Sequence, residues 1–185
     1  KTLGREHPDT AQALNNLGNL YKEMGDYSRA EPLYDRALKI AEKSLGLEHP
    51  ETATSLNNLA VLYEKMGNYT RAEPLYKRSL KIKEKALGPE HPDTATYLNN
   101  LAGLYWAMDD YSRAEPMYKR SLKIKEKTLG PEHPGTGALL NNLAGLYYSM
   151  GDYALAMPMY QRALKIAEKT LGREHPDTAQ ALNNL

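Results

Sequence analysis

Five histidines are the residues of this 185-residue sequence best suited to bind a metal ion or to transfer a proton. Each is followed by proline, and the interval between them is always 42 residues: His7, His49, His91, His133 and His175. Equivalent helices of adjacent repeats are at least about 8–10 Å apart, whereas zinc–nitrogen bonds are about 2 Å long. Because these histidines cannot converge on one ion, we predict that they cap helices and that the chain has no metal site.

Other groups that could perform catalysis are missing or stand in predicted turns. No cysteine occurs, which excludes disulfides, thiol nucleophiles and thiolate metal ligands. The acidic pair Asp109 and Asp110 falls in a turn and is expected to cap a helix. The sequence shows no nucleophile–base pattern and no phosphate-binding glycine loop. We therefore predict a protein that is not an enzyme and carries no cofactor.

Paired asparagines are the most unusual feature of the sequence. Asparagine is a mediocre helix former, yet a pair occurs in the middle of each of five predicted helices: Asn15–Asn16, Asn57–Asn58, Asn99–Asn100, Asn141–Asn142 and Asn183–Asn184. These amides could offer donors and acceptors to an extended peptide backbone. They could equally bond to neighbouring helices and fix the stacking register, and one asparagine of each pair could do each job.

The elements that position these groups recur with the same interval of 42 residues. The tetrapeptide Leu-Asn-Asn-Leu begins at Leu14, Leu56, Leu98, Leu140 and Leu182. A fixed period of this length is typical of a repeat architecture. We predict a single repeat array over residues 1–185, with units at about 7–48, 49–90, 91–132 and 133–174 and a partial fifth unit at 175–185.

Each unit is predicted to form two helices. The first begins at Pro8, because proline presets the helical φ and lacks only a donor that has no partner there. Gly25 ends this helix, and Asp26 caps the second one. Apolar side chains recur at helical spacing in both: Leu14, Leu17 and Tyr21 in the first helix, and Ala30, Leu33, Tyr34, Ala37, Leu38 and Ala41 in the second. Neither helix can cover its apolar stripe alone, so the units must stack on one another.

The balance of charges gives no reason to expect nucleic acid or an anionic membrane as a partner. The sequence has 24 Lys and Arg against 23 Asp and Glu, a formal net charge of +1. Basic stretches at residues 77–85 and 119–127 are interpreted as solvated faces of second helices, and a membrane or nucleic-acid role for them is the lesser alternative. No apolar run approaches the roughly 20 residues that span a bilayer. Since cysteine and a visible signal peptide are both missing, we expect a cytoplasmic protein.

The order of small and aromatic residues in each unit resembles the signature of the tetratricopeptide repeat. In the first unit the matching residues are Leu14, Leu17, Gly18, Tyr21, Gly25, Tyr27, Ala30, Tyr34 and Ala37. The first position of the signature is leucine instead of tryptophan, and the unit is longer than the usual length of about 34 residues. In this it is similar to the repeats of kinesin light chain and nephrocystin-type proteins. The resemblance implies an all-α, right-handed superhelical solenoid of antiparallel helix pairs, which binds protein or peptide segments in a concave groove lined by first helices.

The same resemblance places a row of first-helix side chains in that groove. The candidates are Asn15, Asn16, Asn19, Lys22, Asn57, Asn58, Val61, Glu64, Asn99, Asn100, Trp106, Asn141, Asn142 and Tyr148. A subset of the family clamps the carboxylate termini of chaperones, and Asn58 and Asn100 match the asparagine of that clamp. Its lysine and arginine positions are neutral in this sequence, for example at Gln12, Thr54 and Thr96, so we exclude a chaperone-terminus clamp.

Two of these positions change from unit to unit. The position of Lys22 holds Glu64, Trp106 and Tyr148 in the later units, and the position of Asn19 holds Val61, Gly103 and Gly145. Trp106 and Tyr148, with glycines beside them, could anchor a bound peptide. Trp106 could instead cover a gap that the glycines leave between repeats. We predict that the variable positions set the specificity of binding.

The two ends of the sequence carry the same segment. Residues 1–17 and 169–185 are identical, so the fifth unit begins as the first one does. Its helix would have about nine residues, below the roughly 12–15 at which an isolated helix becomes marginal in water. The alternative function is a structural array, a fragment or a design, that has no specific ligand and associates head-to-tail into open filaments.

Overall fold

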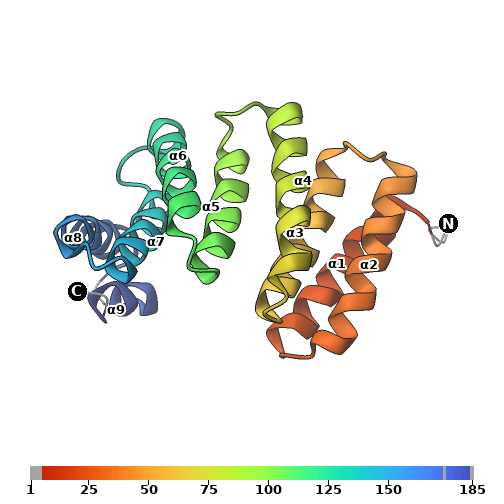
Figure 1. The fold of residues 1–185 in the computed structure, drawn as a ribbon, viewed down its shortest axis with the longest axis horizontal. Coiled ribbons are helices and arrows are strands. Elements are labelled where there is room, and N and C mark those ends of the chain that lie inside the picture. Colours follow the sequence, from red (N-terminus) through yellow and green to blue (C-terminus); the bar gives the residue numbers. More distant parts are fainter. Residues whose placement is uncertain (1–5, 173, 184–185) are drawn as a thin grey trace. The chain divides into compact units, whose positions relative to one another are not determined.

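The computed structural model describes residues 6–172 and 174–183, which form a series of antiparallel helices (Figure 1). The helices are α1 (Pro8–Glu23), α2 (Tyr27–Ser44), α3 (Pro50–Lys65), α4 (Tyr69–Leu87), α5 (Pro92–Ala107), α6 (Tyr111–Leu129), α7 (Pro134–Ser149), α8 (Tyr153–Leu171) and α9 (Pro176–Asn183). No strand occurs among the described residues, and none of their helices is long and apolar enough to cross a bilayer. The predicted all-α fold of helix pairs is confirmed.

Histidine and proline start the first helix of each repeat. The Nδ1 atom of His7 accepts a hydrogen bond from the backbone N–H of Asp9 at 3.2 Å, and His49, His91 and His133 accept in the same way at 3.0–3.2 Å. Proline follows at the position where its missing N–H has no partner to lose. The predicted capping role is confirmed for these four histidines. Within residues 6–172 and 174–183, no group of three or more His, Cys, Asp or Glu is placed to hold a metal ion.

A left-handed residue and an N-cap separate the two helices of each repeat. In three repeats the left-handed residue is glycine with φ of 71–79°, whereas Asp109 adopts φ of 56° in the third. The side chain of Asp26 accepts a hydrogen bond from the backbone N–H of Arg29 at 3.1 Å, and the equivalent residue caps α4, α6 and α8. The predicted turn is confirmed, including the use of Asp109 and Asp110 as a turn residue and a cap.

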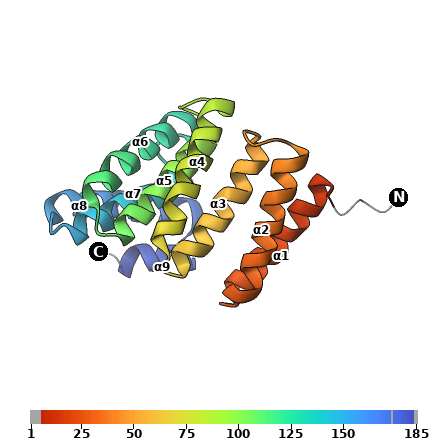
Figure 2. The same ribbon diagram turned by 45° about the vertical axis from the view of Figure 1, so that its right-hand side comes forward.

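The helices group into two compact units, residues 1–89 and 90–185. In the first unit α2 packs against α1 and α3, and α3 packs against α4 (Figure 2). In the second unit each helix from α5 to α9 packs against the next. First helices also touch one another directly, α1 against α3 and α5 against α7. That all 42-residue repeats form one array stays a prediction.

Tyrosine and small residues make the contact between the two helices of a repeat. Tyr34 is wholly buried, and a Cβ atom placed on Gly18 would lie 2.9 Å from its ring. Ala30 and Ala37 are wholly buried as well, so the backbones of α1 and α2 approach closely. The ring of Tyr34 therefore passes Gly18 and brings its hydroxyl to within 2.6 Å of the Asn19 side chain. Small residues on both helices thus allow this close approach.

The basic stretch of α4 is less solvated than the sequence predicts. The Arg78 Nη1 atom lies 2.6 Å from Glu42 Oε1 of α2, and its Nη2 atom donates to the carbonyl oxygen of Leu47 at 3.2 Å. Lys83 is only 8% exposed. The prediction of a solvated face is wrong at this residue, because Lys83 occupies the helical position at which Ala41 faces the interior of the preceding repeat. Its long aliphatic stem is therefore buried.

Candidate functional site

The predicted binding residues lie on the first helix of each repeat. We call the line of contact between α1 and α3 the first seam, and the line of contact between α5 and α7 the second seam. The residues on the helices of the first seam are Asn15, Asn16, Asn19, Lys22, Asn57, Asn58, Val61 and Glu64. Those on the helices of the second seam are Asn99, Asn100, Trp106, Asn141, Asn142 and Tyr148. The structure brings the candidates together in two groups, one in each compact unit.

Asparagine side chains bridge both seams. In the first seam Asn15 is 4% exposed, and its Nδ2 atom donates to Ser55 Oγ at 3.0 Å. In the second seam the Nδ2 atom of Asn142 donates to Asn99 Oδ1 at 2.8 Å. A buried polar group left without a partner costs about 1–3 kcal/mol, so such contacts favour one alignment of the two helices. They support the register role that the sequence left open for these amides.

The second asparagine of the first pair makes its hydrogen bond within its own helix. Asn16 is exposed and accepts a hydrogen bond from Gln12 Nε2 of its own helix at 3.0 Å. Other amides of the seams are half-buried: Asn57, Asn58 and Asn100. Asn184 lies outside the described residues. Contact of these amides with a peptide backbone stays a prediction.

Polar residues of the first seam bind the tyrosine hydroxyls of the second helices. Tyr34 OH donates to Asn19 Oδ1 at 2.6 Å, and Tyr76 OH donates to Glu64 Oε2 at 2.6 Å. Burial raises the pKa of Tyr34 to about 12. Burial also raises the pKa of Glu64, and the hydrogen bond from Tyr76 opposes that effect. Each hydroxyl therefore remains a donor at neutral pH and has an acceptor on the first helix of its own repeat.

The remaining side chains of the first seam add charge but contribute little to stability. Lys22 Nζ lies 3.2 Å from Glu23 Oε1, and Val61 is half-buried. The Glu23 side chain is 75% exposed, and an ion pair of this kind contributes about 0–1 kcal/mol. The surface of the first seam is therefore polar, with charges of both signs.

Trp106 crosses the second seam from α5 to α7. A Cβ atom on Gly145 would lie 2.6 Å from Trp106 Cη2, so the indole ring rests directly on the glycine. The indole N–H donates to Ser149 Oγ at 3.1 Å, and the ring meets that of Tyr118 edge-on at a centroid distance of 6.4 Å. Trp106 is half-buried, so part of its ring still reaches the surface. It thus covers the gap above Gly145, and its contact with a ligand stays a prediction.

Glycines give the second seam a floor made of backbone and tyrosine. A Cβ atom on Gly103 would lie 3.5 Å from Tyr118 OH, and one on Gly145 would lie 3.4 Å from Tyr160 OH. Burial raises the pKa of Tyr160, so its hydroxyl is protonated at neutral pH. Where the first seam has Asn19 and Glu64 near its tyrosine hydroxyls, the second seam has Trp106 above glycine.

Tyr148 meets solvent where Trp106 meets a helix. Tyr148 is 60% exposed and contacts Tyr153 of α8, with ring centroids 5.4 Å apart. Trp106, at the equivalent position of the preceding repeat, reaches Gly145 and Ser149 in the second half of α7. The next first helix, α9, is described to Asn183, which corresponds only to the first half of α7. The two aromatic candidates therefore have different surroundings.

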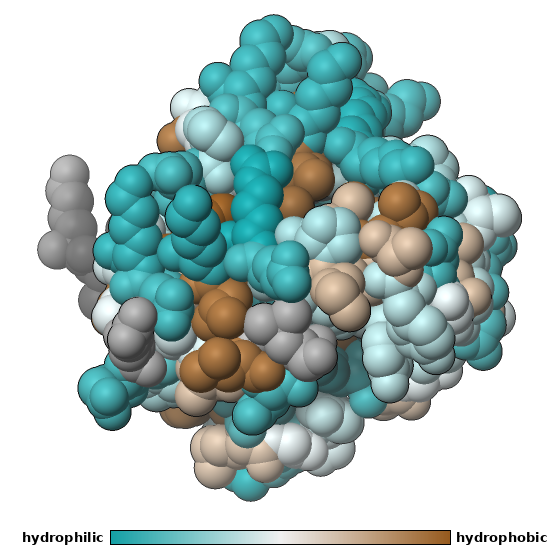
Figure 3. All heavy atoms as spheres, turned by 90° about the vertical axis from the view of Figure 1, so that its left-hand side faces the viewer, coloured by the Kyte–Doolittle hydropathy of each residue, from teal (hydrophilic) through white to brown (hydrophobic). Residues whose placement is uncertain are grey.

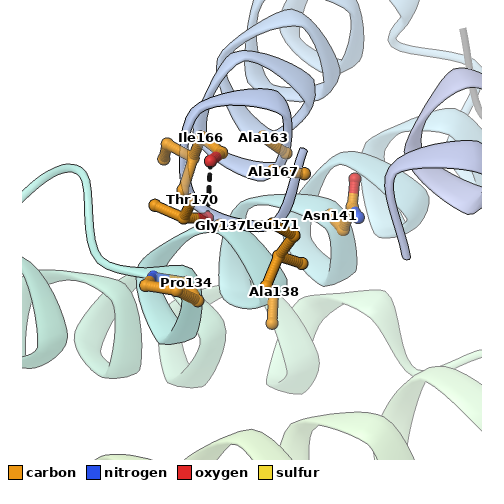
Figure 4. Close-up of a pocket in the computed structure, with 9 residues that line it drawn as sticks. All are labelled: Pro134, Gly137, Ala138, Asn141, Ala163, Ile166, Ala167, Thr170 and Leu171. Atoms are coloured by element: carbon orange, nitrogen blue, oxygen red, sulfur yellow. Dashed lines mark hydrogen bonds between the residues drawn. The ribbon is translucent and has the colours of Figure 1, made fainter. Parts of the chain in front are cut away.

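Asn141 lies at a hollow of about 220 Å³ between α7 and α8 (Figure 4). Gly137 and Ala138 line it from α7, and Ile166 lines it from α8. A Cβ atom on Gly137 would lie 3.2 Å from Ile166 Cγ2. The Oδ1 atom of Asn141 is buried and accepts no hydrogen bond from the described residues. Sequence reasoning missed this hollow, and its only signal is glycine at a position where the other complete units have alanine.

Family models described as tetratricopeptide repeat match nearly the whole chain. One matches residues 51–127, 114–169 and 135–185, and another matches residues 10–51. A search of curated proteins finds no relative of the chain.

Solved structures are similar over most of the chain. BtubC (BKLC) from P. vanneervenii is 30% identical with a TM-score of 0.79, over 92% of this chain and 68% of that chain. A Podosopora anserina putative kinesin light chain with nearly identical TPR-like repeats is 29% identical with a TM-score of 0.82, over 97% of this chain and 85% of that chain. A single-residue variant of the latter is 28% identical with a TM-score of 0.83, over 100% of this chain and 86% of that chain. The predicted similarity to kinesin light chain-type repeats is confirmed.

Proposed function

Because the chain belongs to the tetratricopeptide-repeat family, we propose that it is a scaffold that binds a protein or peptide segment along the first-helix face of its repeats. Repeats of this family generally mediate protein–protein interaction. The observation that carries the proposal is the second seam, where the half-buried ring of Trp106 lies on Gly145. An aromatic side chain that is fixed on one side and accessible on the other is a common anchor of protein interfaces.

The contrast between constant and variable positions supports this proposal. Residues that cap and pack the helices recur in each complete repeat, whereas the position of Lys22 holds Glu64, Trp106 and Tyr148 in the later ones. Packing alone does not require an aromatic residue there, because polar side chains pack the seam of the first compact unit. The variable residues are the ones that distinguish one ligand from another.

The chemistry of the seams favours an extended segment with an apolar side chain. Accessible amides such as Asn16 and Asn100 provide both donors and acceptors for a peptide backbone. Trp106 provides a large and rigid apolar contact. The first seam carries charges of both signs, Lys22 and Glu23 among them, so a strongly acidic or basic ligand gains little from it.

We propose no catalytic role for either seam. Scaffolds of this family are generally non-enzymatic. In the first seam Glu64 accepts a hydrogen bond from Tyr76 of α4 and Lys22 lies beside Glu23, and the second seam carries amides, glycines and aromatic rings.

A random-peptide library displayed on phage and panned on the immobilised chain tests the proposal. Trp106 is the one tryptophan of the sequence, so its fluorescence emission reports directly on the second seam. We expect selected peptides to shift this emission. We also expect Trp106→Ala and Tyr148→Ala each to weaken peptide binding, measured by calorimetry, at least about tenfold, or ~1.4 kcal/mol.

Leu47→Ala is the matched control for these variants. Leu47 is 60% exposed, as Tyr148 is, but it lies in the connection between α2 and α3. Its replacement should leave peptide affinity unchanged, and circular dichroism should show that all three variants remain folded. Selected peptides that bind both aromatic variants as tightly as the wild type would refute the proposed site.

A further inference from the structure

The apolar stripe of α1 is exposed, unlike those of later first helices. Leu17, Leu20 and Met24 are 42%, 56% and 64% exposed. The residues equivalent to Leu17 and Leu20 in α3 and α7 are at most 3% exposed: Leu59, Leu62, Leu143 and Leu146. Both α3 and α7 pack on the second helix of the repeat before them, α2 and α6 respectively. Since no described helix precedes α1, its stripe is a surface that fits a second helix of this kind.

The complementary surface lies on α8, which carries α9. Thr178 Oγ1 of α9 donates to the carbonyl oxygen of Gly172 at 2.7 Å, as Thr52 of α3 does to Gly46 at 2.8 Å. Thr178 and Thr52 are both wholly buried. Therefore α9 is attached to α8 in the way that a complete first helix is attached to the second helix before it.

The first turns of α8 are apolar and exposed. Leu155 and Met157 are 43% and 55% exposed, and they stand at the positions of Arg29 and Glu31 in the first repeat. Figure 3 views the molecule from the side on which Figure 1 labels α8, and it shows apolar residues, in brown and tan, at the surface among paler and teal polar ones. In the first unit Glu31 accepts a hydrogen bond from Tyr63 OH of α3 at 2.8 Å. This part of a second helix is therefore where the second half of the following first helix packs.

The sequence of α9 is that of the first half of α1, because residues 176–183 repeat residues 8–15. We propose that α1 of a second copy packs on α8 in place of α9 and joins the two copies head to tail. The first eight residues of the incoming α1 then make the contacts that α9 makes. This interface uses the outer stripe of α1 and the face of α8, and it borders the proposed peptide site at Tyr148, which stands where Trp106 meets the second half of the next first helix.

The second half of the incoming helix adds contacts that α9 does not make. Leu17 and Leu20 of the second copy become buried, as Leu59 and Leu62 are. Tyr21 of the second copy meets Met157, at the place where Tyr63 meets Glu31. A thioether beside an aromatic ring is a favourable contact, so the replacement of glutamate by methionine suits this interface.

Competition between the two helices makes the assembly depend on concentration. The covalent connection from α8 keeps α9 near its place on α8 at an effective concentration on the order of millimolar. Against this, α9 has eight described residues, whereas α1 has 16 and is held in place by α2. A head-to-tail contact of this kind does not close on itself, so further copies add to either end as concentration rises.

Light scattering of the 185-residue chain after size exclusion, from micromolar to near-millimolar concentration, tests the proposal. We expect the mass to rise from the monomer value of 20.8 kDa to twice that value and beyond. Leu20→Glu and Met157→Glu, at positions 56% and 55% exposed, should each hold the mass at the monomer value. Leu47→Glu, at a position 60% exposed on a connection, should assemble as the wild type does.

A mixture of two variants tests the direction of the contact. Leu20→Glu keeps a functional α8 surface and Met157→Glu keeps a functional α1 stripe, so their equimolar mixture should form a dimer and nothing larger. Ala179→Pro removes the hydrogen bond from the N–H of residue 179 to the His175 carbonyl oxygen and breaks α9. It should therefore move assembly to lower concentration. A wild type that stays monomeric throughout, variants that assemble unchanged, or a mixture that stays monomeric would each overturn the proposal.

Discussion

The two compact units form the same helix pairs, but the side chains on the faces of their first helices differ. In the first seam Asn19 and Glu64 each accept a hydrogen bond at 2.6 Å from a tyrosine hydroxyl of the adjoining second helix. In the second seam Gly103 and Gly145 carry no side chain, and Trp106 covers the glycine of the neighbouring helix. In the first seam the first helix itself supplies an acceptor for the tyrosine hydroxyl. In the second seam the ring of Trp106 reaches across to the first helix of the next repeat.

This difference shows that the framework leaves the seam positions free to vary. Tyr34, Tyr76, Tyr118 and Tyr160 are all buried, so the second helices pack in the same way whichever solution is used. Stability therefore sets limits on the seam residue, such as an acceptor for the hydroxyl or a ring above glycine, but it does not choose between them. The choice is available for ligand binding, and the following changes test how far the two seams differ.

The largest effect is expected from a pair of glycine substitutions in the second seam. In Gly103→Ala the new Cβ atom has Tyr118 OH at 3.5 Å, an ordinary contact, so the gain in helix propensity should stabilise the chain by up to about 1 kcal/mol. In Gly145→Ala the Cβ atom would lie 2.6 Å from Trp106 Cη2, so the ring must move at a cost of about 1–3 kcal/mol. Urea denaturation measures both, and only Gly145→Ala should change the tryptophan emission.

The control for this pair is the double variant Trp106→Ala with Gly145→Ala. Without the indole ring, alanine at residue 145 should be as favourable as alanine at residue 103. Equal stability of Gly103→Ala and Gly145→Ala would show that the position of the Trp106 ring does not require glycine at residue 145.

A smaller effect is expected from removing one tyrosine hydroxyl in each unit. Tyr76→Phe leaves the half-buried carboxylate of Glu64 without its donor, which should cost about 1–3 kcal/mol. The hydroxyl of Tyr160 makes no hydrogen bond within the part of the chain that the structure describes, so Tyr160→Phe should change stability by less than about 0.5 kcal/mol. Thermal unfolding of the two variants decides the matter, and equal losses would contradict the distinction between the seams.

The smallest effect is a pH dependence confined to the first seam. Burial raises the pKa of Glu64 above its ordinary value of 4.5. Between pH 4.5 and the raised pKa of the folded chain, the folded chain binds more protons at this site than the unfolded chain. The contribution of Glu64 to stability therefore falls as pH rises through this window. Glu64→Gln keeps an acceptor for Tyr76 and removes the titration. The free energy of unfolding of this variant should therefore gain on that of the wild type as pH rises through the window. A difference in the free energy of unfolding that stays constant with pH would show that burial does not raise the pKa of Glu64.

Local features of the fold could be predicted from the sequence because their partners are close along the chain. His7 caps the N–H of a residue two positions away, and Asp26 caps one three positions away. The constant interval of 42 residues added the helix pairs, since each pair must stack on its neighbours. In the same way, the identity of Asp109 and Asp110 was enough to predict a turn and a cap.

The partners of the seam residues could not be predicted, because these contacts join residues about one repeat apart; only their kind, amides bonded to a neighbouring helix and Trp106 over a gap, was among the alternatives. Asn15 and Ser55 are 40 residues apart, and Trp106 and Ser149 are 43 apart. Which side chains meet depends on how one first helix lies against the next, and serine at these two positions is shared with no other complete unit. Lys83 is buried for the same reason, since the contact between helices and not the charge of the residue determines its exposure.

Side-chain and backbone NMR of the chain with one phage-selected peptide tests the central claim most directly. If the first-helix face binds the segment, the largest shift changes will fall on the indole N–H of Trp106 and on the side-chain amides of Asn100 and Asn142. Residues on the outer faces of α6 and α8 will change little. Changes confined to those outer faces, with the Trp106 indole unaffected, would contradict the claim that the seam is the binding surface.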